Sequence, residues 1–257
     1  MKENSPGTLY LLPAPLQEFT IENWDPARLA ASFPALAIER LQTLSCFIVE
    51  SEKTAYRLLS RFRTPESMKA VRLHILNEHS AASEVRDLLA PLSSGEDAGF
   101  FSEAGMPCIA DPGAALVAQA HLNGIRVVPV TGPSSILLAL VASGLDAQRF
   151  VFLGYLPAEK GARKTAISRI ARELALDRMT RLFIETPYRN EALVKDCLES
   201  LHQDTWLTIA SDLCGTTQSV RSKTIRQWRS EPYIFAAKDP AVFAIGFPAG
   251  TKPRNTA

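Results

Sequence analysis

Short apolar runs alternate with longer amphipathic stretches along the first half of the chain. The runs that have the length and composition of buried strands are residues 7–12, 45–50, 71–76, 98–101 and 125–130. Apolar residues recur at helical spacing between them, over residues 26–43, 52–62, 83–92 and 111–123. This alternation predicts a mostly parallel sheet with helices on its faces.

The second half has a less regular order. Its candidate strands are residues 150–156, 181–185, 206–211 and 242–247, and its candidate helices are residues 136–143, 161–176 and 190–201. Residues 218–228 have the pattern of an antiparallel addition to the sheet. We therefore expect two α/β domains, with a mostly parallel sheet in residues 1–130 and a mixed sheet in residues 131–257.

Composition narrows the function classes. The chain has 257 residues, 46% of them hydrophobic, and a net charge of +1, so any contact with a polyanion must be local. We find no apolar segment of signal-peptide or membrane-spanning length, and expect a cytoplasmic protein without a membrane role. Cys46, Cys108, Cys197 and Cys214 lack metal-ligand spacing, so we expect reduced thiols and no metal site.

The central feature is the loop that follows the strand at residues 98–101. It is rich in small residues, and Asp111 followed by Pro112 predicts the start of a helix, with Asp111 as its N-cap. Residues 131–135 form a second such turn, and Pro13 ends a third strand. In open α/β sheets small ligands bind at this edge. GxGxxG and GxxxxGK[ST] are both missing, so the usual loops that bind dinucleotides and nucleotide phosphates are not present. The three strand ends side by side would form a crevice lined by main-chain groups. Such a crevice suits a ligand with an amino-acid part and a flat heterocycle.

Residues 102–113, Ser-Glu-Ala-Gly-Met-Pro-Cys-Ile-Ala-Asp-Pro-Gly, resemble the SDAGTPxISDPG signature of the tetrapyrrole methylase superfamily. The branch they resemble most is that of the small-subunit ribosomal RNA 2′-O-methyltransferases. The Gly-Pro-Ser turn at residues 132–134, the sequence Glu-Thr-Pro-Tyr-Arg at residues 185–189 and an HxxNE pattern at residues 74–78 extend the resemblance, which runs over residues 7–212.

The resemblance implies S-adenosylmethionine held in a cleft between two α/β domains, in a homodimer. It assigns cofactor contacts to six segments of the chain. These are Pro13, Ser102, Glu103, Ala104, Gly105, Met106, Pro107, Thr131, Gly132, Pro133, Ser134, Ser135, Phe183, Ile184, Leu213, Pro240, Ala241 and Val242.

Methyl transfer is an in-line displacement, in which the enzyme aligns the reactants and excludes water. A ribose hydroxyl also requires a proton acceptor nearby, and the candidates are Glu50, Glu185 and Asp212. Each of these also fits a surface acid or a helix cap. The predicted substrate contacts are Lys53, His74, Asn77, Glu78 and Arg189.

Departures from the branch leave the acceptor open. Gln17-Glu18 replaces Gly-Asn, Met106 replaces Thr, and residues 211–215 lack the Arg and Lys of the R-E-L-T-K motif. Ribosomal RNA is one acceptor, indicated by the branch and by the basic residues of one helix. Those residues are Lys160, Arg163, Lys164, Arg169 and Arg172. The alternatives are a small molecule such as a tetrapyrrole, and a non-catalytic module that binds S-adenosylmethionine.

Overall fold

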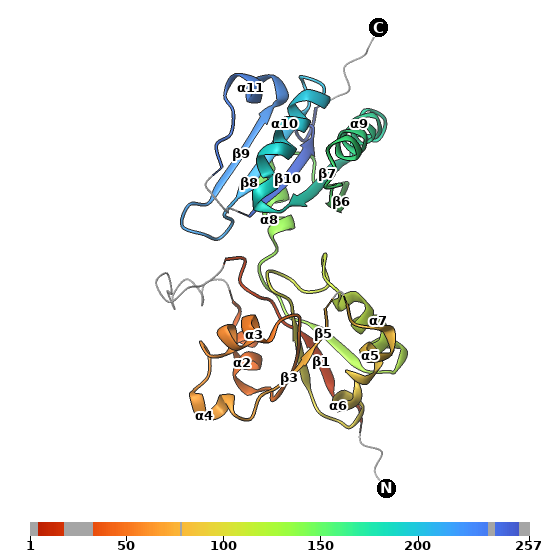
Figure 1. The fold of residues 1–257 in the computed structure, drawn as a ribbon, viewed down its shortest axis with the longest axis vertical. Coiled ribbons are helices and arrows are strands. Elements are labelled where there is room, and N and C mark those ends of the chain that lie inside the picture. Colours follow the sequence, from red (N-terminus) through yellow and green to blue (C-terminus); the bar gives the residue numbers. More distant parts are fainter. Residues whose placement is uncertain (1–4, 18–32, 78, 236–239, 252–257) are drawn as a thin grey trace. The chain divides into compact units, whose positions relative to one another are not determined.

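The computed structural model describes residues 5–17, 33–77, 79–235 and 240–251, and it divides the chain into two compact units, Met1–Ser134 and Ser135–Ala257. The first unit contains one sheet in the order β3-β2-β4-β1-β5, with every neighbouring pair parallel (Figure 1). Its strands are β1 (Thr8–Leu11), β2 (Cys46–Val49), β3 (Arg72–Ile75), β4 (Ala98–Phe101) and β5 (Arg126–Pro129). The predicted parallel sheet is confirmed.

Helices cover both faces of this sheet because its strands are apolar on both sides. Alternate residues of β2 belong to different cores: Phe47 packs with one set of helices and Ile48 with the other. The first set is α2 (Ala35–Thr43), α3 (Glu52–Leu59) and α4 (Pro65–Met68). The second set is α5 (Ala82–Asp87), α6 (Ala90–Ser93) and α7 (Gly113–Leu122).

Two helix predictions in this unit differ from the structure. The stretch 83–92 forms two short helices, α5 and α6, because Pro91 has no N–H for a continuous helical ladder and fits only a first turn. Helix α7 begins at Gly113, with Pro112 as its N-cap residue, so Pro112 does not occupy the first helical position. Residues 26–32 of the first predicted helix lie outside the described residues.

The second unit contains a mixed sheet, as predicted, and its strand order is β6-β7-β10-β8-β9. Only β6 and β7 run parallel, whereas the other three neighbouring pairs are antiparallel. The strands are β6 (Phe150–Tyr155), β7 (Thr180–Glu185), β8 (Trp206–Ser211), β9 (Ser219–Thr224) and β10 (Ala241–Gly246).

The stretch 218–228 is only partly the predicted antiparallel addition. Residues Ser219–Thr224 form β9, but the chain then turns into α11 (Ile225–Ser230). Thr224 and Gln227 form a capping box, in which the Thr224 hydroxyl accepts from the Gln227 N–H. The helix buries Trp228 completely in the core of this unit.

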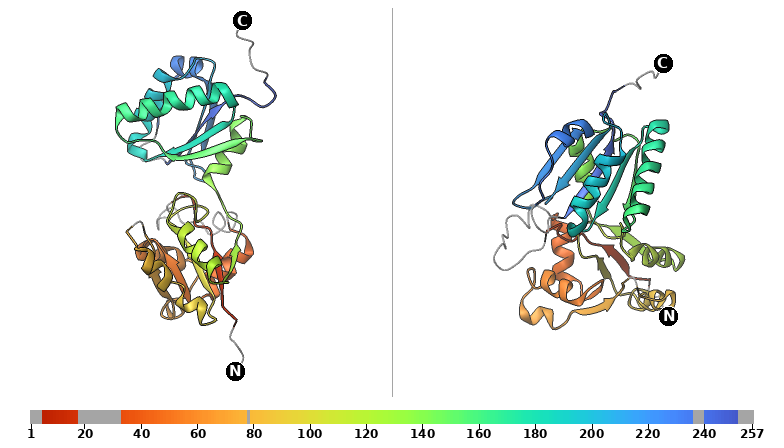
Figure 2. Two further views of the ribbon diagram at one scale, coloured as in Figure 1. Left: turned by 90° about the vertical axis from the view of Figure 1, so that its right-hand side faces the viewer. Right: turned by 45° about the horizontal axis from the view of Figure 1, so that its top comes forward.

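Helices lie on both faces of the second sheet (Figures 1 and 2). Side chains of α9 (Lys160–Asp177), α10 (Asn190–Ser200) and α11 pack on the face that carries Phe183 and Phe243. The opposite face is covered by α8 (Ser135–Ser143), an apolar helix. A short 3₁₀ turn, η1 (Pro187–Arg189), joins β7 to α10.

Candidate active site

Three loops meet at one edge of the first sheet. Because β1 lies between β4 and β5, the loops that leave these strands are neighbours. Ala14 and Gly105 exchange two main-chain hydrogen bonds, of 2.8 and 3.0 Å, which join the loop after β1 to the loop after β4. The structure thus brings Pro13, the segment 102–107 and the segment 131–134 to one place within the first unit.

Glycines allow this close approach. A Cβ atom on Gly132 would lie 2.1 Å from Cβ of Pro13, so no larger residue fits there without a shift of the chain. Gly105 has φ +72°, a left-handed conformation that favours glycine, and the Pro133 carbonyl lies 3.4 Å from the place its Cβ would occupy. The two glycines therefore allow these loops to pack directly against one another.

The Asp111 carboxylate shapes the loop before α7. Its Oδ2 accepts from the Cys108 N–H at 2.6 Å, and its Oδ1 accepts from the Gly113 N–H at 2.7 Å. Two residues of this loop, Cys108 and Ala110, have φ of 69° and 61°, a conformation uncommon outside glycine. Asp111 therefore holds both the loop and the first free N–H of the helix, although the assigned N-cap residue is Pro112.

An open pocket of about 700 Å³ lies at the ends of β2, β3 and β4. It is lined by Glu50, Asn77, His79, Glu103, Ala110, Asp111 and Pro112. The pKa of Glu50 is raised from 4.5 to about 7, chiefly because burial disfavours its charged form, and also by the negative charges of Asp111 and Glu103. A hydrogen bond from the main-chain N–H of Glu103 opposes this shift. Glu50 is thus a carboxylate suited to accept a proton near neutral pH.

The predicted substrate residues of the first unit are spread around this pocket. Asn77 lines it, whereas Lys53 is exposed in the first turn of α3 and His74 lies half-buried in β3. The Nε2 atom of His74 is buried without a hydrogen-bond partner among the described residues. Glu78 falls outside the described part of the chain.

Sequence reasoning missed His79 and the place of Asp111 in this pocket. The available signal was that His79 follows β3 within four residues and that Asp111 ends the loop between β4 and α7, but the spatial order β3-β2-β4 was needed to bring them together. Sequence order alone does not fix which strands are neighbours.

In the second unit, the predicted residues gather at one edge of the mixed sheet. Glu185, Ala241 and Ser211 lie directly opposite one another on β7, β10 and β8, so their side chains share a face. Ile184 and Val242 face the other side. Phe183 is fully buried and stacks on Phe243 with ring centroids 5.7 Å apart, so it belongs to the core of this unit.

Two of the three predicted proton acceptors have local partners in this unit. Oε1 of Glu185 accepts from the Thr186 N–H at 2.7 Å and from Nε of Arg189 at 2.8 Å. Oδ2 of Asp212 accepts from both the N–H and the hydroxyl of Thr217, each at 2.7 Å. These carboxylates therefore stabilise the η1 turn and the β8–β9 turn, which is the cap-like alternative considered for them.

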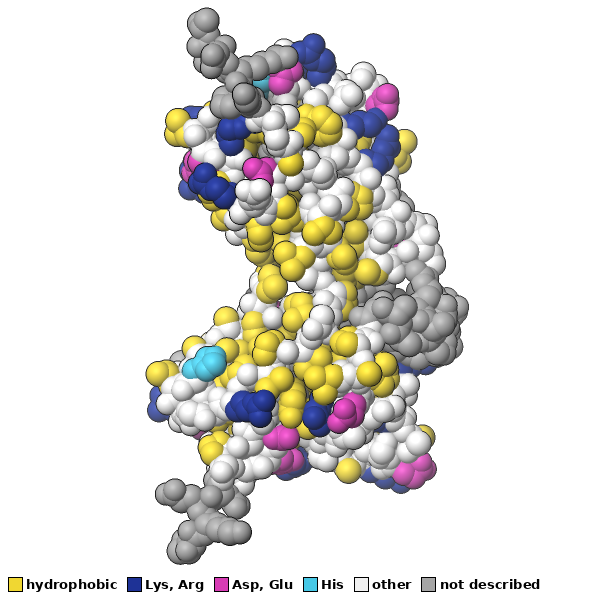
Figure 3. All heavy atoms as spheres, turned by 180° about the vertical axis from the view of Figure 1, so that it is seen from behind, with side chains coloured by type: hydrophobic (Ala, Val, Ile, Leu, Met, Phe, Trp, Pro, Cys, Tyr) yellow, Lys and Arg dark blue, Asp and Glu magenta, His cyan; other side chains and the backbone are white. Residues whose placement is uncertain are grey.

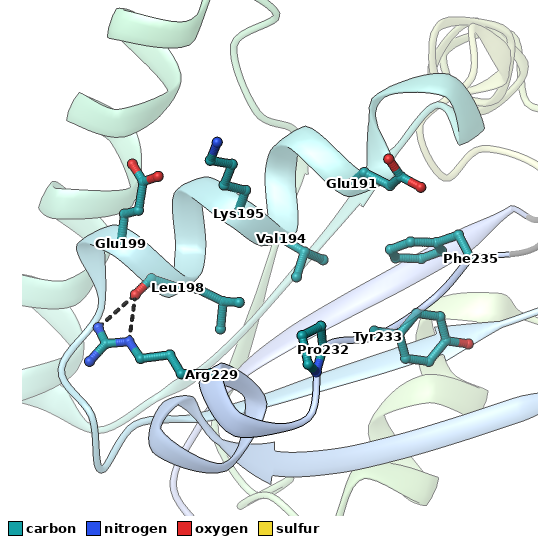
Figure 4. A pocket seen from close by; sticks show the side chains of 9 residues that line it. All are labelled: Glu191, Val194, Lys195, Leu198, Glu199, Arg229, Pro232, Tyr233 and Phe235. Atoms are coloured by element: carbon teal, nitrogen blue, oxygen red, sulfur yellow. Dashed lines mark hydrogen bonds between the residues drawn. The ribbon is translucent and has the colours of Figure 1, made fainter.

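A second pocket lies on the α10 side of this unit (Figure 4). Its volume is about 530 Å³, and it is lined by Glu191, Val194, Lys195, Leu198, Glu199, Arg229, Pro232, Tyr233 and Phe235. Arg229 donates two hydrogen bonds to the Leu198 carbonyl, of 3.0 and 2.6 Å, and thereby caps the end of α10. No residue predicted to bind cofactor or substrate lines this pocket.

Ion pairs occupy much of the predicted basic helix. Arg163 is buried and pairs with buried Asp196 at 2.7 Å, Lys164 pairs with Glu199 at 2.5 Å, and Arg169 lies 3.7 Å from Glu173. Two of the five basic residues, Arg163 and Lys164, thus attach α9 to α10, and Arg169 pairs within α9. The sequence of this helix therefore overstates the charge that it offers to RNA.

The profile of the family described as Tetrapyrrole (Corrin/Porphyrin) Methylases matches residues 32–228. Two solved structures share the fold over almost the whole chain. The methyltransferase CobJ has a TM-score of 0.56 at 14% identity and covers 95% of each chain. The uroporphyrin-III-C-methyltransferase from Thermus thermophilus has a TM-score of 0.50 at 15% identity and covers 93% of this chain and 92% of the other.

Closer relatives in sequence carry the name Ribosomal RNA small subunit methyltransferase I. The one from Escherichia coli O157:H7 is 30% identical over 223 residues, which cover 87% of this chain and 71% of the relative. The one from Mesorhizobium japonicum is 33% identical over 190 residues, which cover 74% of this chain and 62% of the relative. The chain belongs to the tetrapyrrole methylase family, in the branch of these ribosomal RNA methyltransferases.

Family membership confirms the predicted class of enzyme, a methyltransferase that uses S-adenosylmethionine. Among the described residues, no helix has both the length and the apolar character needed to cross a membrane. Within the same residues, no group of three or more His, Cys, Asp or Glu is placed to hold a metal ion.

Proposed function

We propose that this chain transfers the methyl group of S-adenosylmethionine to a ribose 2′-hydroxyl of small-subunit ribosomal RNA. The acceptor is supported by relatives named Ribosomal RNA small subunit methyltransferase I, which are 30–33% identical to the chain. The chemistry is supported by one observation above the others: Glu50 lines a pocket at the strand ends and has its pKa raised to about 7.

Different residues of the first unit would bind the cofactor, accept the proton and orient the acceptor. The segments 102–107 and 131–134, with Pro13, would hold S-adenosylmethionine through main-chain groups, as the family resemblance implies, and the Ala14–Gly105 hydrogen bonds join two of these loops. The bound cofactor supplies an electrophilic methyl group on its sulfonium. Glu50 would accept the proton that the acceptor hydroxyl loses on methylation. Asn77 and His79 orient the acceptor by hydrogen bonds.

The same pocket argues against a tetrapyrrole acceptor. Glu50, Glu103 and Asp111 place three carboxyl groups around it. A tetrapyrrole precursor carries several carboxylates of its own, and like charges in a half-buried pocket repel. A neutral ribose that donates a hydroxyl hydrogen bond suits these acceptors better. The roles proposed for Glu185, Asp212, Arg189, Phe183, Ile184, Leu213 and residues 240–242 rest on the family resemblance.

The direct test is transfer of labelled methyl. Small ribosomal subunits from cells that lack this protein would be incubated with labelled S-adenosylmethionine and the purified chain. We expect about one methyl group per RNA, recovered as a 2′-O-methylnucleoside after digestion. Label on a base, or label only on a tetrapyrrole precursor tested in parallel, would exclude the proposed acceptor.

We also propose that the chain is a cytoplasmic homodimer. The four cysteines are all free in the structure, which fits a reducing compartment. Val141 on α8 and Leu176 on α9 are large exposed apolar residues of the second unit, of the kind that subunit interfaces cover. Sedimentation at micromolar concentration tests the dimer, and a single species of 28.1 kDa would contradict it.

A further inference from the structure

The outward face of α3 combines cationic and aromatic side chains. Lys53, Tyr56, Arg57 and Ser60 follow one another at the spacing of a single helix face. Tyr56 is 58% exposed, and Lys53 is exposed as well. The opposite face of α3 buries Ala55, Leu58 and Leu59 in the core of the first unit. The exposed tyrosine therefore plays no part in packing the helix.

This face lies beside the pocket that contains Glu50. Helix α3 begins at Glu52, two residues after Glu50, and Ser51 caps it by accepting from the Thr54 N–H at 3.4 Å. The Thr54 hydroxyl donates to Oε1 of Glu103, a residue that lines the pocket, at 3.3 Å. The first turn of α3 thus lies next to the pocket, and Tyr56 and Arg57 lie one turn further along the helix.

The pocket is lined by acidic groups, whereas the neighbouring face of α3 carries basic groups, so the two regions favour different parts of a nucleotide. Carboxyl groups of Glu50, Glu103 and Asp111 repel phosphate from the pocket itself. A nucleotide whose ribose enters the pocket must therefore place its flanking phosphates outside. Lys53 and Arg57, one turn apart, offer cations there, and Glu52 lies one turn before Tyr56 on the same side of the helix. Unpaired bases stack on exposed aromatic rings, and Tyr56 supplies such a ring beside the two cations.

On the face drawn in Figure 3, Lys and Arg side chains of the described residues are scattered among acidic ones and form no single large patch. This scattered distribution favours a local contact with RNA, next to the pocket, over a contact across a large basic surface.

We infer that the face formed by Lys53, Tyr56 and Arg57 binds the single-stranded RNA that flanks the target nucleotide. Phosphates lie on Lys53 and Arg57, and one unpaired base stacks on Tyr56. This inference rests on the proposed function, because it assumes RNA as the acceptor. Beyond the proposed reaction, it identifies a surface of α3 that would select a single-stranded RNA target.

The test measures RNA binding and methyl transfer separately. A fluorescently labelled single-stranded ribosomal RNA fragment would be titrated with the chain and with Tyr56→Ala, Tyr56→Phe and the double variant Lys53→Ala/Arg57→Ala. We expect Tyr56→Ala to weaken RNA binding and raise KM about tenfold with kcat within twofold, and Tyr56→Phe to restore both. The double variant should reduce the slope of log affinity against log salt by about 1.4, because two phosphate contacts are lost.

Matched controls come from the second unit. Tyr155→Ala removes an exposed tyrosine of similar exposure, 55%, and Arg172→Ala removes an exposed cation of α9. Both should leave RNA affinity and the salt slope unchanged, and all variants should bind S-adenosylmethionine like the parent chain. The inference is overturned if the α3 variants bind RNA as well as the parent does, or if the controls lose as much. RNA that binds through α3 but never receives methyl would instead refute the proposed function alone.

Discussion

Glu50 is the residue on which the proposed chemistry depends. Its carboxyl is half-buried beside Asp111 and Glu103, and this environment raises its pKa to about 7. A proton acceptor is most effective when its pKa lies near the working pH. The predicted alternatives, Glu185 and Asp212, are engaged by Arg189 and Thr217 instead.

Replacement of Glu50 should change the pH dependence of transfer. The rate of the parent chain should rise with pH and level off above about 7, because only the ionised carboxylate accepts the proton. Glu50→Gln should lower kcat by roughly 10²–10⁴-fold and remove this rise, while the affinity for S-adenosylmethionine stays the same. Single-turnover rates between pH 5.5 and 9 provide the measurement. A variant that keeps the parent's pH profile would rule out Glu50 as the acceptor.

The same pKa shift predicts an effect on stability. A carboxyl whose pKa is raised in the folded state, here from 4.5 to about 7, binds protons more tightly when folded. Its stabilising contribution is complete below pH 4.5 and is lost as the pH rises through 7. Relative to the parent chain, Glu50→Gln should therefore gain melting temperature at pH 8 and lose that advantage by pH 4.5. Equal differences in melting temperature at both pH values would contradict this account.

At the scale of elements, α9 and α10 are joined by a buried ion pair. The Arg163 and Asp196 side chains are 5% and 2% exposed, and Arg163 also donates to the Ala158 carbonyl at 2.9 Å. Removing one partner leaves the other charge buried and unpaired, which costs more than the loss of the attraction itself. The pair therefore makes the attachment of α9 sensitive to single substitutions.

Asp196→Ala should destabilise the chain by about 3–5 kcal/mol in urea denaturation. The control is Glu199→Ala, which breaks the exposed pair with Lys164 on the same two helices and should cost less than about 1 kcal/mol. If the two substitutions cost the same, the buried pair would not hold the helices as described.

The predictions of helices and strands are right or wrong for physical reasons that the structure shows. Strands β1 to β5 follow from short apolar runs between turn residues, and β8 begins and ends at the predicted residues 206 and 211. Residues 225–228 were assigned to a strand, although the Thr224 and Gln227 capping box marks a helix start there. The division of residues 83–92 at Pro91 was likewise readable from the proline.

At the scale of the whole molecule, the sequence indicated the family and named Glu50, Asn77 and Glu103 separately as site residues, but it did not show that they line one pocket. Glu50, Asn77 and Glu103 follow three different strands, and only the order β3-β2-β4 makes those strands neighbours. For the basic helix, α9, the sequence instead suggested more available charge than the structure shows. Its charges are evident in the sequence, but their partners Asp196 and Glu199 come from another helix.

The central claim is that main-chain atoms at the strand ends bind S-adenosylmethionine. Its most direct test is calorimetric titration of S-adenosylmethionine into the parent chain, Ser102→Ala, Thr131→Ala and Gly132→Ala, with each variant checked for an unchanged circular dichroism spectrum. We predict dissociation constants within about threefold of the parent for the two side-chain truncations, because they leave the main chain in place. Gly132→Ala should weaken binding by about tenfold or more, because its Cβ would meet Pro13 at 2.1 Å and displace the loop. Loss of binding on truncating Ser102 or Thr131, with Gly132→Ala binding normally, would contradict the account.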